Sequence, residues 1–352
     1  MDPMSLALPI LDPGPQRPDY AQGPKSLSSV KLLRLSVTDR CNLRCVYCMP
    51  EDGVTFYDRK DLLTAEQIIA VAAAARSIGV THFKLTGGEP TVRKDLIKIV
   101  EGIKALDPDD LSMTTNGVLL PKLAEPLRDA GLDRLTLSLD SMRPDVFDQI
   151  TGGHGYGLDD LHRGIQAAYD AGFTHLKFNV VVIGGMNDDE VTELARLTLD
   201  NPWTVRFIEY MPLGESKLLI DGLDTANLYT VDNAEVIRRI EAQMGALTPV
   251  DRAGEPGVGP ANVFSLPGAA GRVGFISAMS KPFCETCNRL RLTADGQLRA
   301  CLFDGGEVDT LPILDDPTAN AADIIELMSR CVSEKPDTHS GRGNRAMSQL
   351  GG

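Results

Sequence analysis

The sequence predicts an α/β fold whose larger part is an incomplete (β/α)6 TIM-like barrel. Strand-like and helix-like segments alternate six times between residues 31 and 211, which implies parallel strands joined by crossovers. Several of these strands carry polar side chains on one face, such as Arg34 and Ser36, or Lys177 and Asn179. Charges halfway along a strand favour a barrel lumen that holds a ligand, because in a packed doubly wound sheet they would be costly.

The expected strands are short apolar runs bounded by turn residues. They are Leu32–Thr38, Thr81–Thr86, Leu111–Thr115, Arg134–Leu139, Thr174–Ile183 and Trp203–Tyr210. The clearest helix begins at Thr64, whose hydroxyl can cap it while Gln67 closes a capping box, and it ends at Gly79. The stretch 157–171 ends in the same way, at Gly172.

Three parts are expected along the chain. Residues 1–29 are rich in Pro, Ser and Gly near their end and predict a disordered extension. Residues 30–230 form the partial barrel, whose last portion, 212–230, is expected to be a loop. Residues 231–352 form a C-terminal region with helices at 233–245 and 324–332, a Gly- and Pro-rich turn at 251–260 and a polar tail.

The composition excludes some classes of function. Lys and Arg number 35 against 49 Asp and Glu, so the net charge of −14 argues against a general nucleic-acid binder and leaves a local basic pocket for a small anion open. No apolar run approaches the ~18 residues of a membrane span. The apolar residues 5–11 lack a basic flank and contain a proline, so we expect no signal peptide and a cytoplasmic location.

Six of the seven cysteines fall into two triplets, which is typical of intracellular metal chemistry rather than disulfides. The triplets are Cys41, Cys45 and Cys48, and Cys284, Cys287 and Cys301. Three thiolates can hold a [4Fe–4S] cluster and leave one iron open, or fill three of the four positions on zinc. For the second triplet, Cys331 or His339 would have to complete a zinc site.

The first triplet follows the first strand directly, where βα-barrel proteins place their chemistry. Its C-x3-C-x-aromatic-C spacing, followed after the second strand by Gly87-Gly88-Glu89-Pro90, resembles the radical S-adenosylmethionine (SAM) superfamily. This resemblance implies that the open iron binds the amino and carboxylate groups of SAM. It also implies that an electron from the reduced cluster releases a 5′-deoxyadenosyl radical.

The second triplet, the segment Asn288-Arg289-Leu290-Arg291 and the terminal Gly351-Gly352 narrow the resemblance, over roughly residues 31–352, to the family of GTP 3′,8-cyclases in molybdenum cofactor biosynthesis. The resemblance implies that the radical removes H3′ of the GTP ribose and that C3′ attacks C8. The product would be (8S)-3′,8-cyclo-7,8-dihydroguanosine 5′-triphosphate, the first intermediate of the pathway.

The same resemblance implies two [4Fe–4S] clusters and SAM as cofactors, with a C-terminal region that carries the second cluster and closes the barrel. It implies GTP as substrate, an external electron donor, and transfer of the product to a cyclic pyranopterin monophosphate synthase. The chain would be a monomer or homodimer without a nucleic-acid or membrane partner.

Individual roles also follow from the resemblance. It assigns the two clusters to the six cysteines of the triplets, SAM contacts to Tyr47, Gly88, Ser138 and Met211, GTP contacts to Arg34, Lys84, Thr115, Lys177, Arg206, Arg289, Leu290 and Arg291, and catalytic roles to Arg34, Gly351 and Gly352. The family commonly has arginine where Lys84 stands, and lysine keeps the charge but loses the bidentate fork.

Two other hypotheses stay open. One is a peptide-modifying radical SAM enzyme with an auxiliary cluster, although such enzymes usually carry more than three C-terminal cysteines. The other is a metal-binding interaction module without catalysis. Metal content separates the module from the enzyme, because two zincs per chain would favour the module and about eight irons the enzyme.

Overall fold

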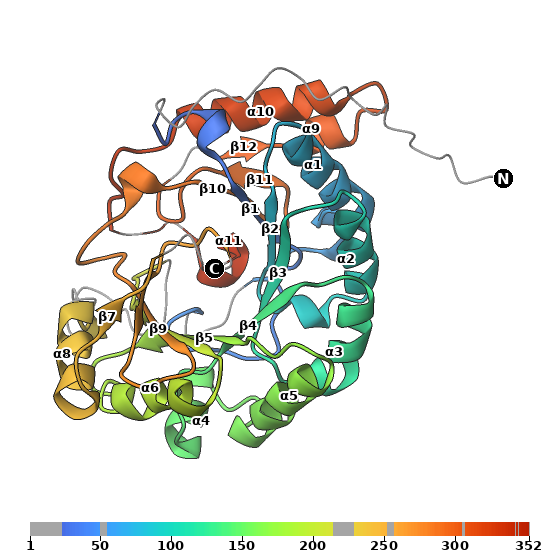
Figure 1. The fold of residues 1–352 in the computed structure, drawn as a ribbon. Coiled ribbons are helices and arrows are strands. Elements are labelled where there is room, and N and C mark those ends of the chain that lie inside the picture. Colours follow the sequence, from blue (N-terminus) through green and yellow to red (C-terminus); the bar gives the residue numbers. More distant parts are fainter. Residues whose placement is uncertain are drawn as a thin grey trace.

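The computed structural model describes residues 23–49, 55–213, 229–251, 257–304, 307–341, 343 and 345–351. Their strands form one sheet in the order β12-β11-β10-β1-β2-β3-β4-β5-β6-β9-β8-β7. The sheet curves so that one face surrounds the short C-terminal helix α11 (Met347–Leu350), while the longer helices lie around the outside (Figure 1). No helix in the described part of the chain has both the length and the apolar character to cross a membrane.

The six expected strands are confirmed; five are a little shorter than predicted, and the third begins one residue earlier, at Asp110. They are β1 (Leu32–Ser36), β2 (His82–Thr86), β3 (Asp110–Thr115), β4 (Arg134–Ser138), β5 (Lys177–Val182) and β6 (Thr204–Glu209). Each pairs with the next in parallel. The helices between them are α1 (Ala65–Ser77), α2 (Leu96–Lys104), α3 (Leu120–Asp129), α4 (Pro144–Thr151), α5 (Leu158–Asp170) and α6 (Val191–Asp200). The predicted parallel α/β arrangement is therefore confirmed.

The helix ends follow local chemistry. At the start of α1, the Thr64 hydroxyl accepts from the Gln67 backbone N–H at 3.2 Å, and the Gln67 amide oxygen accepts from the Thr64 N–H at 2.9 Å. This is the predicted capping box. Gly79, just beyond the helix, has φ +89°, a value that favours glycine. Between sheet and helices lies the apolar core, which includes the fully buried Leu33 and Phe83.

The C-terminal region extends the sheet at both ends. After α8 (Asn233–Met244), β9 (Arg272–Ile276) pairs in parallel with β6, and β10 (Arg289–Leu292) pairs in parallel with β1. Outside them lie antiparallel strands, namely β7 (Thr248–Pro249), β8 (Asn262–Ser265), β11 (Gln297–Arg299) and β12 (Val308–Asp309). The helices α9 (Leu311–Leu314) and α10 (Ala321–Ser333) follow. The parallel pairing of β10 with β1, which the sequence did not predict, places Arg291 opposite Arg34 and Arg289 opposite Leu32.

Some expectations concern residues outside the described part of the chain. These are 1–22 of the expected disordered extension, 214–228 of the expected loop, and 252–256 of the expected turn. At the end of the expected extension, Leu27–Ser29 form a short 3-10 helix, η2, in which Ser29 is buried.

Candidate active site

A row of cations crosses the concave face of the sheet. The backbone register places Arg34 of β1 opposite both Lys84 of β2 and Arg291 of β10. Ser112 of β3 lies opposite Lys84 on one side and Arg134 of β4 on the other. Since alternate residues of a strand point to the same face, one register brings these five side chains together along the wall of one cavity.

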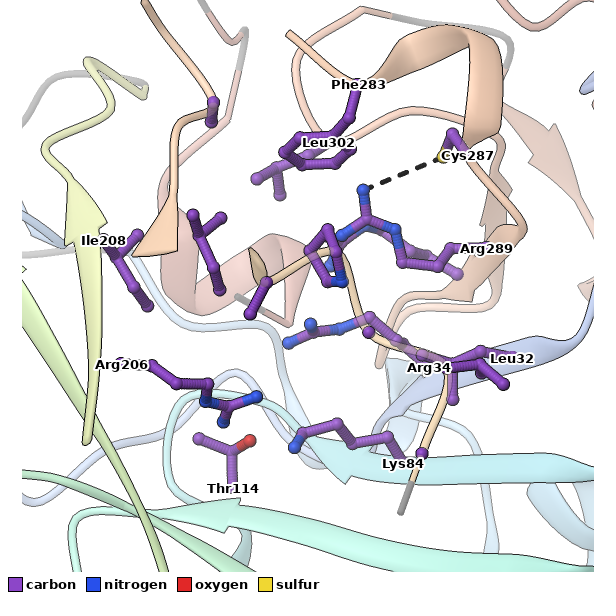
Figure 2. Close-up of a pocket in the computed structure, with 18 of the residues that line it drawn as sticks. Leu32, Arg34, Lys84, Thr114, Arg206, Ile208, Phe283, Cys287, Arg289 and Leu302 are labelled. Carbon is purple, nitrogen blue, oxygen red and sulfur yellow. Dashed lines mark hydrogen bonds between the residues drawn. The ribbon is translucent and has the colours of Figure 1, made fainter. Parts of the chain in front are cut away.

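The cavity is strongly positive. Figure 2 shows the side chains of Arg34, Lys84, Arg206 and Arg289 pointing into it, and Lys177 lines it as well. The hydroxyl of Thr136 accepts from Lys84 Nζ at 3.1 Å and from Arg206 at 3.3 Å. Burial and the neighbouring cations lower the pKa of Lys84 well below its ordinary value. Packed cations of this kind are suited to a polyanion such as a triphosphate, which arginine forks bind through paired hydrogen bonds.

The second cysteine triplet lines the same cavity. Cys284 lies in the short 3-10 helix η6 (Cys284–Thr286), and the Arg289 guanidinium donates to the Cys287 sulfur at 3.8 Å. Burial raises the pKa of Cys287, but the cations Arg289 and Lys335 outweigh it and lower that pKa to about 7. Cys287 is therefore readily ionised and suited to bind metal.

Neither residue considered as a fourth zinc ligand is well placed. The Nε2 atom of His339 lies 2.9 Å from the carbonyl oxygen of Ala278, and its Nδ1 accepts from the Gly341 N–H at 3.1 Å. Both ring nitrogens are thus already engaged. Cys331 is fully buried in the hydrophobic core.

The first triplet occupies the loop after β1. The backbone N–H of Leu43 donates to the Cys41 sulfur at 3.4 Å, and Cys48 N–H donates to the Cys45 carbonyl at 2.9 Å. Burial, together with the Glu89 carboxylate, raises the pKa of Cys41 to about 11. Burial and the neighbouring Cys41 raise the pKa of Cys48 to about 12. These thiols therefore stay protonated at neutral pH unless a bound cation stabilises the thiolates.

The arrangement of the cysteines in each triplet can be compared with the ligand geometry of a single metal ion and of a cluster. Within the described ranges, no three His, Cys, Asp or Glu side chains converge as ligands of a single ion would. A [4Fe–4S] cluster does not require such convergence, because each thiolate binds a different iron. The first triplet lies on one short loop, the second lies at one cavity, and each has an N–H donor aimed at one of its sulfurs, so both fit a cluster of this kind.

Gly87 and Gly88 pack directly against the loop that leads to the first triplet. A Cβ atom at Gly87 would lie 2.4 Å from the Thr38 carbonyl oxygen, and one at Gly88 would lie 2.4 Å from that of Arg40. Next to them, the buried Glu89 carboxylate accepts from the Thr115 hydroxyl at 2.6 Å. The Gly-Gly-Glu-Pro motif therefore fixes the start of the cysteine loop to the end of β2.

Replacing Gly88 with Ala is expected to displace this loop, because the contacting atoms are backbone and cannot rotate away. We expect the variant to retain about half the reconstituted iron of the parent or less, as the first triplet loses its arrangement. A suitable control is Gly157→Ala, where the added Cβ would lie at an ordinary 3.7 Å from Asp148. Equal iron content in the Gly88 variant and the control would show that the close approach is not required.

The C-terminal tail, with α11, lies inside the curve of the sheet (Figure 1). The carbonyl oxygen of Gly351 accepts from Arg291 at 2.9 Å and from the Thr86 hydroxyl at 3.2 Å. Met347 lines the cavity of the second triplet, while the backbone N–H of Ser348 donates to the Cys48 sulfur. The tail therefore touches both halves of the site. Gly352 lies outside the described residues.

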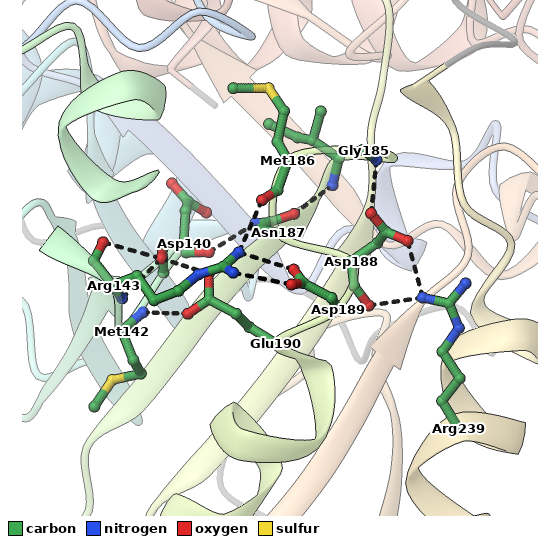
Figure 3. A network of polar contacts seen from close by, with 12 residues as sticks. Asp140, Met142, Arg143, Gly185, Met186, Asn187, Asp188, Asp189, Glu190 and Arg239 are labelled. Carbon is green, nitrogen blue, oxygen red and sulfur yellow. Dashed lines mark hydrogen bonds and ion pairs between the residues drawn. The ribbon is translucent and has the colours of Figure 1, made fainter. Parts of the chain in front are cut away.

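Tyr47 is held by a polar network at the end of β4 and β5. Its hydroxyl donates to Asp140 Oδ2 at 2.9 Å, and Asp140 Oδ1 accepts from the Val181 N–H at 2.8 Å. Asn187 donates to the Asp140 carbonyl at 2.7 Å, in the network shown in Figure 3. Burial raises the pKa of Asp140 to about 6. The ring next to Cys48 is thus fixed to the sheet rather than left to rotate.

The other residues assigned by resemblance fall in different places. Met211 lines the cavity, and Ser138 ends β4 opposite Asn179 of β5. Thr115 is buried with its hydroxyl bound to Glu89, and the Leu290 side chain belongs to the hydrophobic core, so neither side chain lines the cavity. Sequence reasoning missed Arg134, which alternation with Thr136 on one strand face could have revealed, and Lys335, for which the sequence offers no signal.

The chain is similar to known proteins over most of its length. Residues 35–198 match the radical SAM superfamily, and residues 203–341 match the family described as Molybdenum Cofactor Synthesis C. A protein named GTP 3′,8-cyclase from Pelotomaculum thermopropionicum is 46% identical over 330 residues, 92% of this chain and 98% of its own. One of the same name from Heliobacterium modesticaldum is 44% identical over 333 residues, with the same coverage.

A solved structure, Streptococcus suis SuiB bound to precursor peptide SuiA, is similar with a TM-score of 0.57 at 14% identity, over 91% of this chain and 76% of that one. This likeness concerns the fold alone. The parallel α/β fold and the matching motifs of its first half define the chain as a radical SAM protein. The sequence identity of 44–46% with these two relatives, over nearly the whole length, shows that the chain belongs to the GTP 3′,8-cyclase family.

Proposed function

We propose that this chain converts GTP into (8S)-3′,8-cyclo-7,8-dihydroguanosine 5′-triphosphate, the first step of molybdenum cofactor biosynthesis. The observation that carries the proposal is the cavity lined by both the cation row and the second cysteine triplet, with the tail linking it to the first triplet. In this arrangement, a polyanionic substrate would bind between two candidate sites for iron–sulfur clusters.

The first triplet would hold the [4Fe–4S] cluster that binds SAM, with Tyr47, Gly88, Ser138 and Met211 as SAM contacts. When bound, this cluster supplies the electron that cleaves SAM. The cations of the cavity would bind the triphosphate, with Arg34 and the tail acting at the ribose. Arg291 is suited to link triphosphate binding to the position of the tail, because it lines the cavity and donates to the carbonyl of Gly351. Holding the substrate in one orientation and excluding water are the main tasks of these side chains.

We also infer that the second triplet holds a second [4Fe–4S] cluster and that the curved sheet is an incomplete (β/α)6 TIM-like barrel closed by the C-terminal region. The lowered pKa of Cys287 and the two cations that lower it, Arg289 and Lys335, support an anionic cluster at this position. An external electron donor, product transfer to cyclic pyranopterin monophosphate synthase and a cytoplasmic location remain predictions.

The proposal is tested by anaerobic reconstitution with iron and sulfide, followed by incubation with SAM, a reductant and GTP. We expect about eight irons per chain, and 5′-deoxyadenosine and the cyclised nucleotide in equal amounts. 5′-Deoxyadenosine without a GTP product would favour a peptide substrate. Two zincs per chain and no 5′-deoxyadenosine would contradict the enzyme altogether.

A further inference from the structure

Lys335 is a buried cation at the second cysteine triplet to which neither the resemblance nor the proposed reaction gives a role. It follows α10, is only 3% exposed, and lines the cavity together with Cys284, Cys287 and Cys301. Its ammonium donates to the carbonyl oxygens of Cys287, at 3.0 Å, and Arg289, at 3.3 Å. Lys335 thus connects the end of α10 to the segment that carries Cys287.

The charge balance around this lysine is unusual. Among the described residues, no carboxylate lies within ion-pair distance of its ammonium. A buried ammonium without a counter-charge is costly, and hydrogen bonds to two neutral carbonyls offset only part of that cost. The nearby groups that can supply negative charge are the thiols of Cys287 and Cys301, which line the same cavity.

The neighbouring cation Arg289 is arranged differently. Its guanidinium lies 4.8 Å from the centre of the Phe283 ring and points into the cavity, where a substrate can reach it (Figure 2). Lys335, in contrast, uses two of its three N–H donors on the backbone on both sides of Asn288. These two bonds hold its ammonium at the segment that carries Cys287.

We propose that Lys335 is a positioning residue for the second triplet, which clamps the backbone from Cys287 to Arg289 and supplies the positive charge that balances the anionic group held by these thiolates. This inference rests on the proposed second [4Fe–4S] cluster. A fixed positive charge beside such a cluster stabilises its more reduced, more negative state and so raises its reduction potential.

The test uses the full-length chain with Cys41, Cys45 and Cys48 replaced by Ala, so that the second triplet alone can hold a cluster. In this background Lys335 is kept or replaced by Met, Gln or Arg. Lys281→Met is the matched control, because it removes a lysine charge from an exposed position on the loop before Cys284. The readouts are iron per chain, the rate of cluster loss to a chelator, and the reduction potential followed by electron paramagnetic resonance.

We expect Lys335→Met to lose the cluster on the order of 10-fold faster than the parent and to lower its reduction potential. Lys335→Arg should retain a potential close to that of the parent, since it keeps the charge. If Lys335→Met folds poorly, Lys335→Gln decides, because its amide can still donate to a carbonyl but carries no charge. A potential and a rate of loss in Lys335→Gln equal to those of Lys281→Met would overturn the inference.

The failure of the proposed function has a different signature. If the parent with Lys335 intact binds no iron after removal of the first triplet, the second cluster does not exist and the inference fails with it. If that parent binds about four irons and the Lys335 variants behave like the control, only the inference about Lys335 is wrong.

Discussion

Replacing Gly351 with Ala is expected to lower the rate of GTP conversion by about 100-fold, as a displacement of about 1 Å near the reacting groups can do. Gly351 has φ +68°, and an added Cβ would lie 2.6 Å from the Thr86 hydroxyl and 2.9 Å from the Ser36 Cβ. The residue therefore cannot stay where it is. Its carbonyl would leave Arg291 and Thr86, and the tail would lose its anchor within the curve of the sheet.

The measurement is the initial rate of cyclised product at saturating SAM and GTP, with iron content recorded for each preparation. Gly172→Ala serves as the control, because Gly172 also has a left-handed φ, of +90°, but lies at the end of α5 with no atom within 4 Å of the added Cβ. It carries the same backbone strain without the collision. A Gly351 variant that makes product as fast as this control would show that the position of the tail is not needed for the reaction.

The tail is anchored a second time outside the cavity, which makes this prediction specific to its last residues. Arg345 forms ion pairs with Asp295 at 3.1 Å and with Glu307 at 2.8 Å. The collision at Gly351 is expected to move the end of the tail while Arg345 keeps its base in place. The iron content should accordingly remain that of the parent.

Much of the fold could be predicted because its signals are local. The apolar runs of β1–β6 and the capping box at Thr64 depend on residues close together in sequence, and they appear as expected. The partners of β10 could not be predicted in this way. Its four residues, Arg289–Leu292, carry an alternating pattern, but the parallel pairing with β1 joins segments more than 250 residues apart.

The candidate site shows the same division. Alternation along a strand identifies Arg34 and Lys177 as polar residues on one face, and the structure places both at the cavity. The same alternation turns the Leu290 side chain into the core, between two arginines that line the cavity. The proposed role of Lys335 could not be predicted from the sequence, because it depends on two backbone carbonyls nearly fifty residues earlier in the chain.

The cation row also explains how an acidic protein can bind a triphosphate. The net charge of −14 describes the whole chain, whereas the register of the five strands β10, β1, β2, β3 and β4 concentrates positive charge on one face. Mutual repulsion among these buried cations destabilises the protein without its ligand. A polyanion in the cavity removes that repulsion, so binding and stability are linked through the same side chains.

Replacing Lys84 with Met is therefore expected to have two opposite effects. GTP binding should weaken by about 10- to 100-fold, the loss of one hydrogen bond to a charged group, when measured calorimetrically without SAM. The free protein should melt at a higher temperature, because a buried cation among Arg34, Arg134, Lys177 and Arg206 has been removed. Lys94→Met, which removes a charge from an exposed position, should change neither quantity.

The pH dependence distinguishes charge repulsion from a simple loss of contact. Burial and the surrounding cations place the pKa of Lys84 in the folded protein below its ordinary value of 10.5. Protonation of Lys84 therefore destabilises the free protein. This destabilisation is absent above pH 10.5, grows as the pH falls toward the lowered pKa, and stays constant below that pKa.

GTP affinity should decline with rising pH as Lys84 loses its proton. Lys84→Arg should remove that part of the decline because arginine stays charged. An identical pH profile for the lysine and arginine proteins between pH 7 and about 10 would show that Lys84 does not titrate in this range. The arginine that the family commonly has at this position would then differ from Lys84 only in its hydrogen-bonding geometry.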